Sequence, residues 1–84
     1  LTRAARHIEE SARDGYARAR LFLGIMYSKG QGVARNPATA YYWLTLATTG
    51  EAKTARRYLS NLEDFLTSEQ ISKAKEKAKS FRPE

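Results

Sequence analysis

Apolar side chains recur three and four residues apart along most of this chain, with charged residues between them. That spacing places the apolar side chains on one face of a helix. It predicts five helical stretches, which are residues 2–13, 17–28, 37–49, 51–65 and 68–82. The pattern therefore predicts an all-α fold of about five helices.

Glycine, proline and small polar residues mark the ends of these stretches. Gly15 and Gly50 each follow an apolar stretch, where glycine commonly ends a helix because it takes a positive φ without steric cost. Asn36 followed by Pro37 predicts an N-cap and the first position of a helix. Residues 67–70, Thr-Ser-Glu-Gln, predict another N-cap with acidic and amide groups in the following turn. These signals divide the apolar stretches into separate helices.

The sequence also repeats itself 35 residues apart. The repeated positions keep their spacing: Ala5, Ile8, Ala12, Gly15 and Ala17 recur as Ala40, Trp43, Ala47, Gly50 and Ala52. A fixed period of this size is typical of stacked helical hairpins, in which each hairpin buries its apolar face against its neighbours. The chain is therefore expected to be part of a helical repeat array.

One complete unit of this period carries a specific motif. A Leu-Gly pair, a Gly-x-Gly-Val loop and an Ala-x2-Trp element follow one another, at Ala19, Leu23, Gly24, Tyr27, Gly30, Gly32, Val33, Ala40, Trp43, Ala47 and Gly50. In this order and spacing they resemble a Sel1-like repeat, a relative of the tetratricopeptide repeat. The resemblance implies a right-handed α-α superhelix, a solenoid of antiparallel helical hairpins, that acts as a protein-binding scaffold or adaptor without catalysis.

The resemblance is unequal along the chain, because nothing after Gly50 corresponds to the Gly-x-Gly loop. The expected organisation is a single Sel1-like repeat domain over residues 1–84. Within it we expect the second helix of a preceding repeat at 1–14, one complete repeat at 15–50, and a degenerate C-terminal capping pair of helices at 51–82.

The net charge narrows the choice of partners. Fifteen Lys and Arg residues oppose nine Asp and Glu residues, for a formal net charge of +6. Such an excess favours acidic partners through long-range attraction. Nucleic acid is a less favoured alternative, because most aromatic residues fall at repeat-core positions and the C-terminal lysines spread around their helix.

Length and composition set further limits. The chain has 84 residues and no cysteine, so its core depends on apolar packing without disulfides. Its apolar runs are too short to cross a bilayer, so we expect a soluble chain without a membrane span. No signal peptide follows Leu1, and the absence of an initiator methionine suggests a fragment. The sequence leaves the cellular compartment open.

No set of residues forms a recognisable reactive site. His7 is the single histidine, the chain has no cysteine, and no histidine or carboxylate stands four residues after His7 to bind a metal with it. Glu9 and Glu10, two and three residues after His7, are expected to be solvated helix charges. The Gly30–Gly32 loop lacks the third glycine and the preceding strand of a dinucleotide-binding motif. We therefore predict no catalytic, cofactor-binding or metal-binding residues.

A candidate partner surface lies on the helix predicted at 17–28. Arg18, Phe22, Ile25 and Lys29 fall on one stripe of this helix, opposite its motif residues. The stripe is apolar in the middle and basic at both ends, so it suits an acidic or amphipathic segment of another protein. Two alternatives stay open: Phe22 and Ile25 pack against the neighbouring hairpin, or the surface serves self-association within a longer array.

Overall fold

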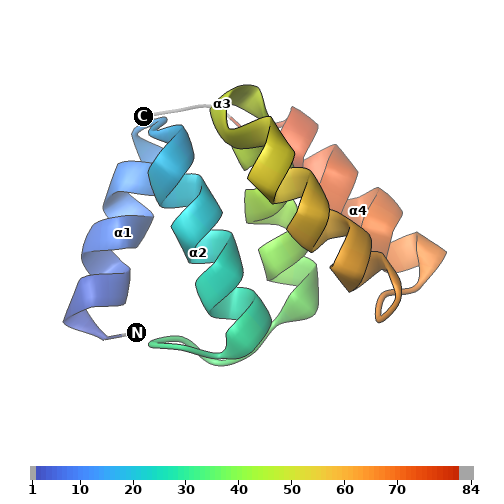
Figure 1. The fold of residues 1–84 in the computed structure, drawn as a ribbon, viewed down its shortest axis with the longest axis horizontal. Helices are drawn as coiled ribbons and strands as arrows, with labels where there is room; N and C mark the ends of the chain where they lie inside the picture. Colours follow the sequence, from blue (N-terminus) through green and yellow to red (C-terminus); the bar gives the residue numbers. More distant parts are fainter. Residues whose placement is uncertain (1, 82–84) are drawn as a thin grey trace.

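A computed structural model describes residues 2–81 of the chain, and over that range the protein has four helices and no strand (Figure 1). The helices are α1 (Arg3–Arg13), α2 (Ala17–Lys29), α3 (Pro37–Glu63) and α4 (Ser68–Lys79). The predicted all-α class is confirmed. Residue 1 and residues 82–84, which include the bounds of the predicted domain at 1–84 and of the predicted capping pair at 51–82, lie outside the described residues.

The count of about five helices is not confirmed, because the stretches predicted at 37–49 and 51–65 belong to one element, α3. Helical backbone angles are nevertheless interrupted from Thr49 to Glu51, and Gly50 has a φ of 153°. A Cβ at Gly50 would lie 2.6 Å from the Cβ of Ala17, so the site requires glycine for space as well as for conformation. The later part of α3, yellow to orange in Figure 1, turns back beside its green first part.

Side-chain caps fix the starts of three helices. The Thr2 hydroxyl accepts a hydrogen bond from the backbone N–H of Ala5 at 3.1 Å, which caps α1. The Asn36 side chain accepts from the N–H of Thr39 at 3.1 Å and caps α3. At α4, Thr67 and Gln70 form a reciprocal capping box. The N-caps predicted from Asn36-Pro37 and from residues 67–70 are therefore confirmed.

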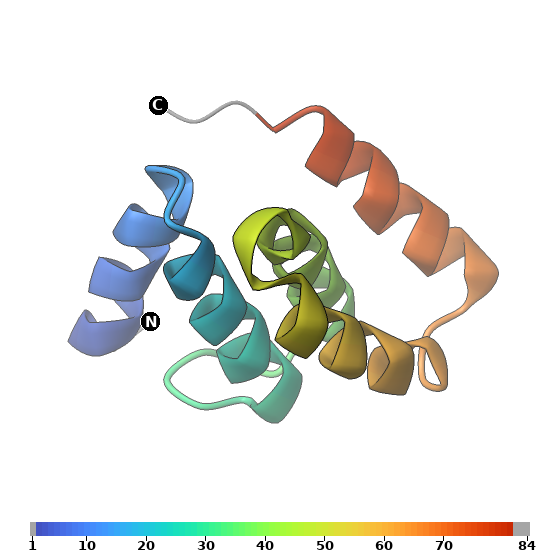
Figure 2. The ribbon, with the colours of Figure 1, turned by 45° about the horizontal axis from the view of Figure 1, so that its top comes forward.

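The described helices pack in the order in which they follow along the chain: α1 on α2, α2 on α3, and α3 on α4 (Figure 2). The α2–α3 contact is the closest fit, because Gly24 faces the Leu44 side chain. A Cβ on Gly24 would lie 2.6 Å from Cγ of Leu44 and 3.3 Å from the carbonyl oxygen of Ala40. This glycine lets the two helix backbones approach each other.

The core consists of two clusters of buried residues on these helices. The larger cluster joins α2, both parts of α3 and α4 through Leu21, Ala40, Tyr41, Leu44, Ala47, Ala55, Leu62 and Ala74. The smaller cluster joins α1, α2 and α3 through Ala12, Leu23 and Trp43. Alanines occupy about half of these positions, which brings helix backbones close together. Within residues 2–81, no helix combines the length and apolar character that a membrane span requires.

A buried tyrosine links the two parts of α3. Tyr41 is only 2% exposed, and its hydroxyl donates a hydrogen bond of 2.7 Å to Oε2 of Glu63. Burial, and then the hydrogen bond to this carboxylate and its charge, raises the pKa of Tyr41 to about 12. The hydrogen bond therefore holds the end of α3 against its first part over the whole physiological pH range.

Candidate interaction surfaces

The four residues of the stripe predicted on α2 differ in their exposure to solvent. Arg18 and Lys29 are exposed and Phe22 is 49% exposed, whereas Ile25 is half-buried and packs against the larger core cluster. The helical spacing therefore places these four side chains on one stripe, but they do not share one environment. Phe22 is the part of the stripe that stays open for contact.

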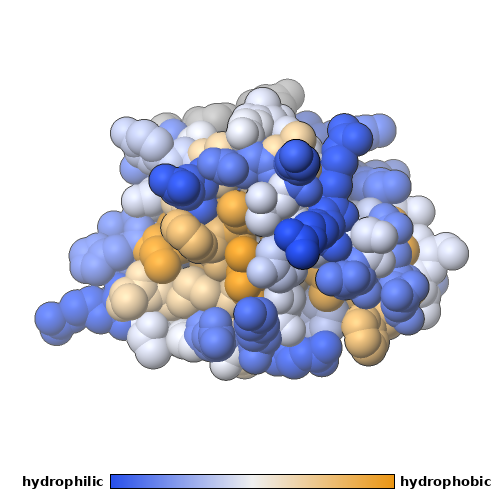
Figure 3. Space-filling view, in the orientation of Figure 1, coloured by the Kyte–Doolittle hydropathy of each residue, from blue (hydrophilic) through white to orange (hydrophobic). Residues whose placement is uncertain are grey.

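Phe22 and Arg18 border a shallow hollow between α1 and α2. The hollow has a volume of about 430 Å³ and is lined by His7, Ile8, Ser11, Tyr16, Arg18, Ala19 and Phe22. Figure 3 shows hydrophobic side chains gathered over α2 on the face of the molecule that carries this helix. We call the hollow lined by these seven residues the α1–α2 hollow. Arg18 is the one Lys, Arg, Asp or Glu residue in its lining, and the lining residue His7 is exposed.

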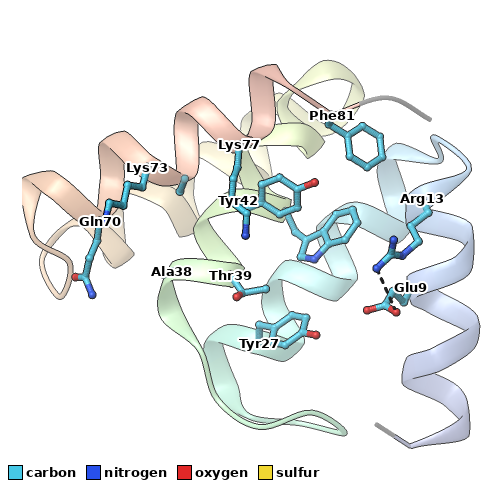
Figure 4. A pocket seen from close by; sticks show the side chains of 12 residues that line it. Glu9, Arg13, Tyr27, Ala38, Thr39, Tyr42, Gln70, Lys73, Lys77 and Phe81 are labelled. Atoms are coloured by element: carbon cyan, nitrogen blue, oxygen red, sulfur yellow. Dashed lines mark ion pairs between the residues drawn. The ribbon is translucent and has the colours of Figure 1, made fainter. Parts of the chain in front are cut away.

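A second and larger cavity lies between α1 and α4, above the first part of α3 (Figure 4). Its volume is about 580 Å³. It is lined by Glu9 and Arg13 from α1, Tyr27 from α2, Ala38, Thr39, Tyr42 and Trp43 from α3, and Gln70, Lys73, Ala74, Lys77 and Phe81 from α4 and the residues after it. We call this cavity the aromatic groove. It shares no lining residue with the α1–α2 hollow.

Three aromatic rings form the floor and one end of the groove. The ring centroids of Tyr42 and Trp43 are 5.0 Å apart, and Phe81 lies 6.0 Å from Trp43 and 6.4 Å from Tyr42, all in edge-on arrangements. Trp43 is buried, whereas Tyr42 and Phe81 are half-buried and form part of the lining. The floor and this end of the groove are therefore aromatic.

The walls of the groove carry more positive than negative charge. Arg13 pairs with Glu9 at 3.8 Å on the α1 wall, and the Nζ of Lys77 lies 5.7 Å from the centroid of the Tyr42 ring on the α4 wall (Figure 4). Lys73 pairs with Glu69 at 3.4 Å, a contact in which both side chains are largely exposed. Exposed pairs of this kind are weak. The lysines of α4 can therefore exchange their partners for an incoming carboxylate.

A buried arginine lies against the aromatic ring at one end of the groove. Arg20 is 8% exposed, and its Nε donates a hydrogen bond of 3.0 Å to the carbonyl oxygen of Ala12 near the end of α1. Its guanidinium lies 4.8 Å from the centroid of the Phe81 ring. Arg20 belongs to neither of the two ion pairs formed within residues 2–81. Its guanidinium places a positive charge beside the Phe81 ring.

The tyrosines of the groove respond to these charges. Burial raises the pKa of Tyr42, while Arg13 and Arg20 act to lower it. Burial and the Glu9 carboxylate raise the pKa of Tyr27, and Arg13 again acts to lower it. Both hydroxyls are neutral at physiological pH and can donate hydrogen bonds. Arg13 and Arg20 thus act on Tyr42 in the same direction, but burial outweighs them and its pKa stays raised.

Sequence reasoning did not find the aromatic groove, because its lining comes from all four helices. Within the described part of the chain, no three His, Cys, Asp or Glu side chains gather as a metal site would require. No family model matches the chain, and no curated protein or solved structure matches it significantly. The fold and the two surfaces define a small all-helical protein with an apolar hollow and a basic, aromatic groove.

Proposed function

We propose that this chain is a protein-interaction scaffold built from Sel1-like repeats, and that it performs no catalysis of its own. The order of helix packing supports the proposal, because each described helix packs on its neighbours along the chain, as in repeat arrays. Two of the motif residues also have a clear role in helix packing. Gly24 allows the close α2–α3 approach, and Trp43 fills the space between α1, α2 and α3.

The single observation that carries the binding function is the exposure of Phe22. A large apolar side chain that is half exposed in an apolar hollow loses free energy to solvent unless a partner covers it. Arg18 lies one turn before it, and Lys29 lies about 10 Å further along α2. We propose that a partner segment places an apolar side chain against Phe22 and acidic side chains near these two cations.

The experiment compares two exposed phenylalanines. The purified chain serves as bait in an extract of its source cells, and captured proteins are identified and then tested as purified partners. Phe22→Ser should lose the partner, whereas Phe65→Ser, which removes the other exposed phenylalanine, should retain it. Circular dichroism should show that both variants stay helical. Equal capture by wild type and Phe22→Ser would refute the proposal that this surface binds the partner.

A further inference from the structure

Several side chains of the aromatic groove carry a hydrogen-bond donor that has no partner among residues 2–81. They are the hydroxyls of Tyr27, Thr39 and Tyr42, which lie between the α1 and α4 walls in Figure 4, and the indole N–H of Trp43. No buried side-chain nitrogen or oxygen in this range lacks a partner, so these groups reach solvent. Trp43 is only 4% exposed and lines the groove, so its N–H opens there. The groove therefore presents unused donors to a ligand.

The charged side chains of the lining favour a negatively charged ligand. The lining contains three cations and one carboxylate, which are Arg13, Lys73, Lys77 and Glu9. Glu9 stands on α1 and pairs with Arg13 there, across the groove from the two lysines (Figure 4). Lys77 enters no ion pair with the described residues, and the pair of Lys73 with Glu69 is exposed and weak. A carboxylate therefore finds uncompensated positive charge at the α4 wall.

The spacing of the two lysines matches an extended peptide. Lys73 and Lys77 are four residues apart on α4, which places them about 6 Å apart along the helix axis. Side chains two residues apart in an extended peptide lie on one side of its backbone, at roughly 7 Å from each other. Two acidic residues separated by one other residue can therefore each contact one lysine.

The unused donors favour an extended segment over a helical one. Most carbonyl groups of a helix accept hydrogen bonds within that helix, whereas those of a single extended segment are available to a partner. The indole N–H of Trp43 and the hydroxyl of Tyr42 can donate to such carbonyl oxygens. An extended acidic segment therefore supplies acceptors to the donors of the groove as well as negative charge to its α4 wall.

A nucleic-acid strand satisfies the groove less completely. Its backbone carries a negative charge on every unit, so a strand that contacts the lysines also brings charge to the α1 wall, where Glu9 stands. An acidic peptide can direct its carboxylates toward α4 alone and present an uncharged side to α1. Its backbone N–H groups can also donate to Glu9, whereas phosphate groups only accept.

We infer that the aromatic groove binds an extended acidic segment of another protein, with two carboxylates against Lys73 and Lys77 and a backbone carbonyl oxygen against the indole N–H of Trp43. The inference goes beyond the proposed function, because the groove shares no lining residue with the α1–α2 hollow. It requires no contact with the ring of Phe81, which already lies against the guanidinium of Arg20.

The first test uses the indole N–H of Trp43 as a reporter. The chain has one tryptophan, so a single indole signal in a proton–nitrogen NMR spectrum reports on the groove. The probe is acetyl-Thr-Glu-Thr-Glu-Thr-amide, whose β-branched residues favour an extended backbone. It should shift this signal and saturate with a dissociation constant on the order of 100 μM.

Two control peptides separate charge from spacing. Acetyl-Thr-Gln-Thr-Gln-Thr-amide keeps the length and removes the charge, and it should bind about fivefold more weakly or less. Acetyl-Thr-Glu-Glu-Thr-Thr-amide keeps both charges, but its adjacent carboxylates point to opposite sides of an extended backbone. It should bind about threefold more weakly than the probe, because one of its carboxylates cannot reach the α4 wall.

The second test changes the groove and measures binding of the same probe. Lys73→Ala/Lys77→Ala should weaken binding by about fivefold or more. Lys75→Ala/Lys79→Ala removes the same charge from α4 outside the groove lining and should bind like wild type. Phe22→Ser, in the α1–α2 hollow, should also bind like wild type. All substituted residues are exposed, and circular dichroism checks that each variant is folded.

The inference is overturned if the indole signal does not move at millimolar probe, if the Glu and Gln peptides bind equally, or if both lysine pairs have equal effects. It is also overturned if a short single-stranded DNA binds more tightly than the probe at the same salt concentration, because the ligand is then nucleic acid. None of these results affects the capture experiment for the α1–α2 hollow.

Discussion

The Tyr41–Glu63 hydrogen bond should make the stability of this protein depend on alkaline pH. The pKa of Tyr41 rises from 10.0 to about 12 on folding. Its folded-state pKa lies above the unfolded value, so the associated stability is fully present below pH 10 and is lost as the pH rises toward 12. A shift of that size corresponds to about 2.7 kcal/mol in total, of which about 1.4 kcal/mol is lost by pH 11.

The variant Tyr41→Phe isolates this effect. Near pH 7 it should be less stable than wild type by about 1 kcal/mol, because it lacks one partly buried hydrogen bond while Glu63 returns to solvent. Phenylalanine has no hydroxyl proton to lose. The stability of the Tyr41→Phe variant should therefore not fall through ionisation of residue 41. The difference between the two proteins should shrink to about zero by pH 11.

Urea titrations at a series of pH values, followed by circular dichroism, measure this difference. Burial also raises the pKa of Tyr27 and Tyr42, but both residues are present in each protein, so their contributions cancel in the comparison. Glu63→Gln is an intermediate control, because it keeps a hydrogen-bond acceptor and removes the negative charge. If wild type and Tyr41→Phe lost stability in parallel between pH 9 and pH 11, the assigned role of Tyr41 would be wrong.

Three further changes test the helix contacts and caps through urea denaturation. Gly24→Ala should destabilise by about 1–3 kcal/mol, because its Cβ would meet the Leu44 side chain; an unchanged midpoint would contradict the close α2–α3 contact. Thr67→Ala should cost about 1 kcal/mol by removing the capping box, and Thr67→Ser should recover most of it. Thr39→Glu should add about 0.3–1 kcal/mol, because it places a carboxylate in the first turn of α3; a lower midpoint would refute this. It cannot complete a capping box, since the N–H of Asn36 already donates to Tyr27.

Local features of the fold could be predicted from the sequence because their causes are local. The Asn36-Pro37 pair and the Thr67–Gln70 segment each act within one turn, and both caps form where they were expected. The break near Gly50 was also expected, but its form was not. The chain turns back within Thr49–Glu51, where three residues leave helical backbone angles, so the two predicted stretches follow each other inside α3 without a loop between them.

The surfaces depended on contacts that helical spacing does not encode. Periodicity places Phe22 and Ile25 on one stripe of α2, yet Ile25 packs against the core and Phe22 is half exposed. The difference arises from which helices cover each end of the stripe. The aromatic groove was missed for the same reason, because Arg13, Tyr42 and Lys77 come together only after α1, α3 and α4 are placed.

The groove follows from the way in which the described helices pack. The chain-order contacts α1–α2, α2–α3 and α3–α4 leave α1 and α4 without direct helix-to-helix contact across the first part of α3. Alanines and Gly24 bring α2 and α3 close together, whereas the facing positions on α1 and α4 carry the long side chains of Arg13, Lys73 and Lys77. Charged side chains of this kind keep their ends in water and resist closure of the gap. The aromatic floor therefore stays accessible because the residues on both sides of it are hydrated.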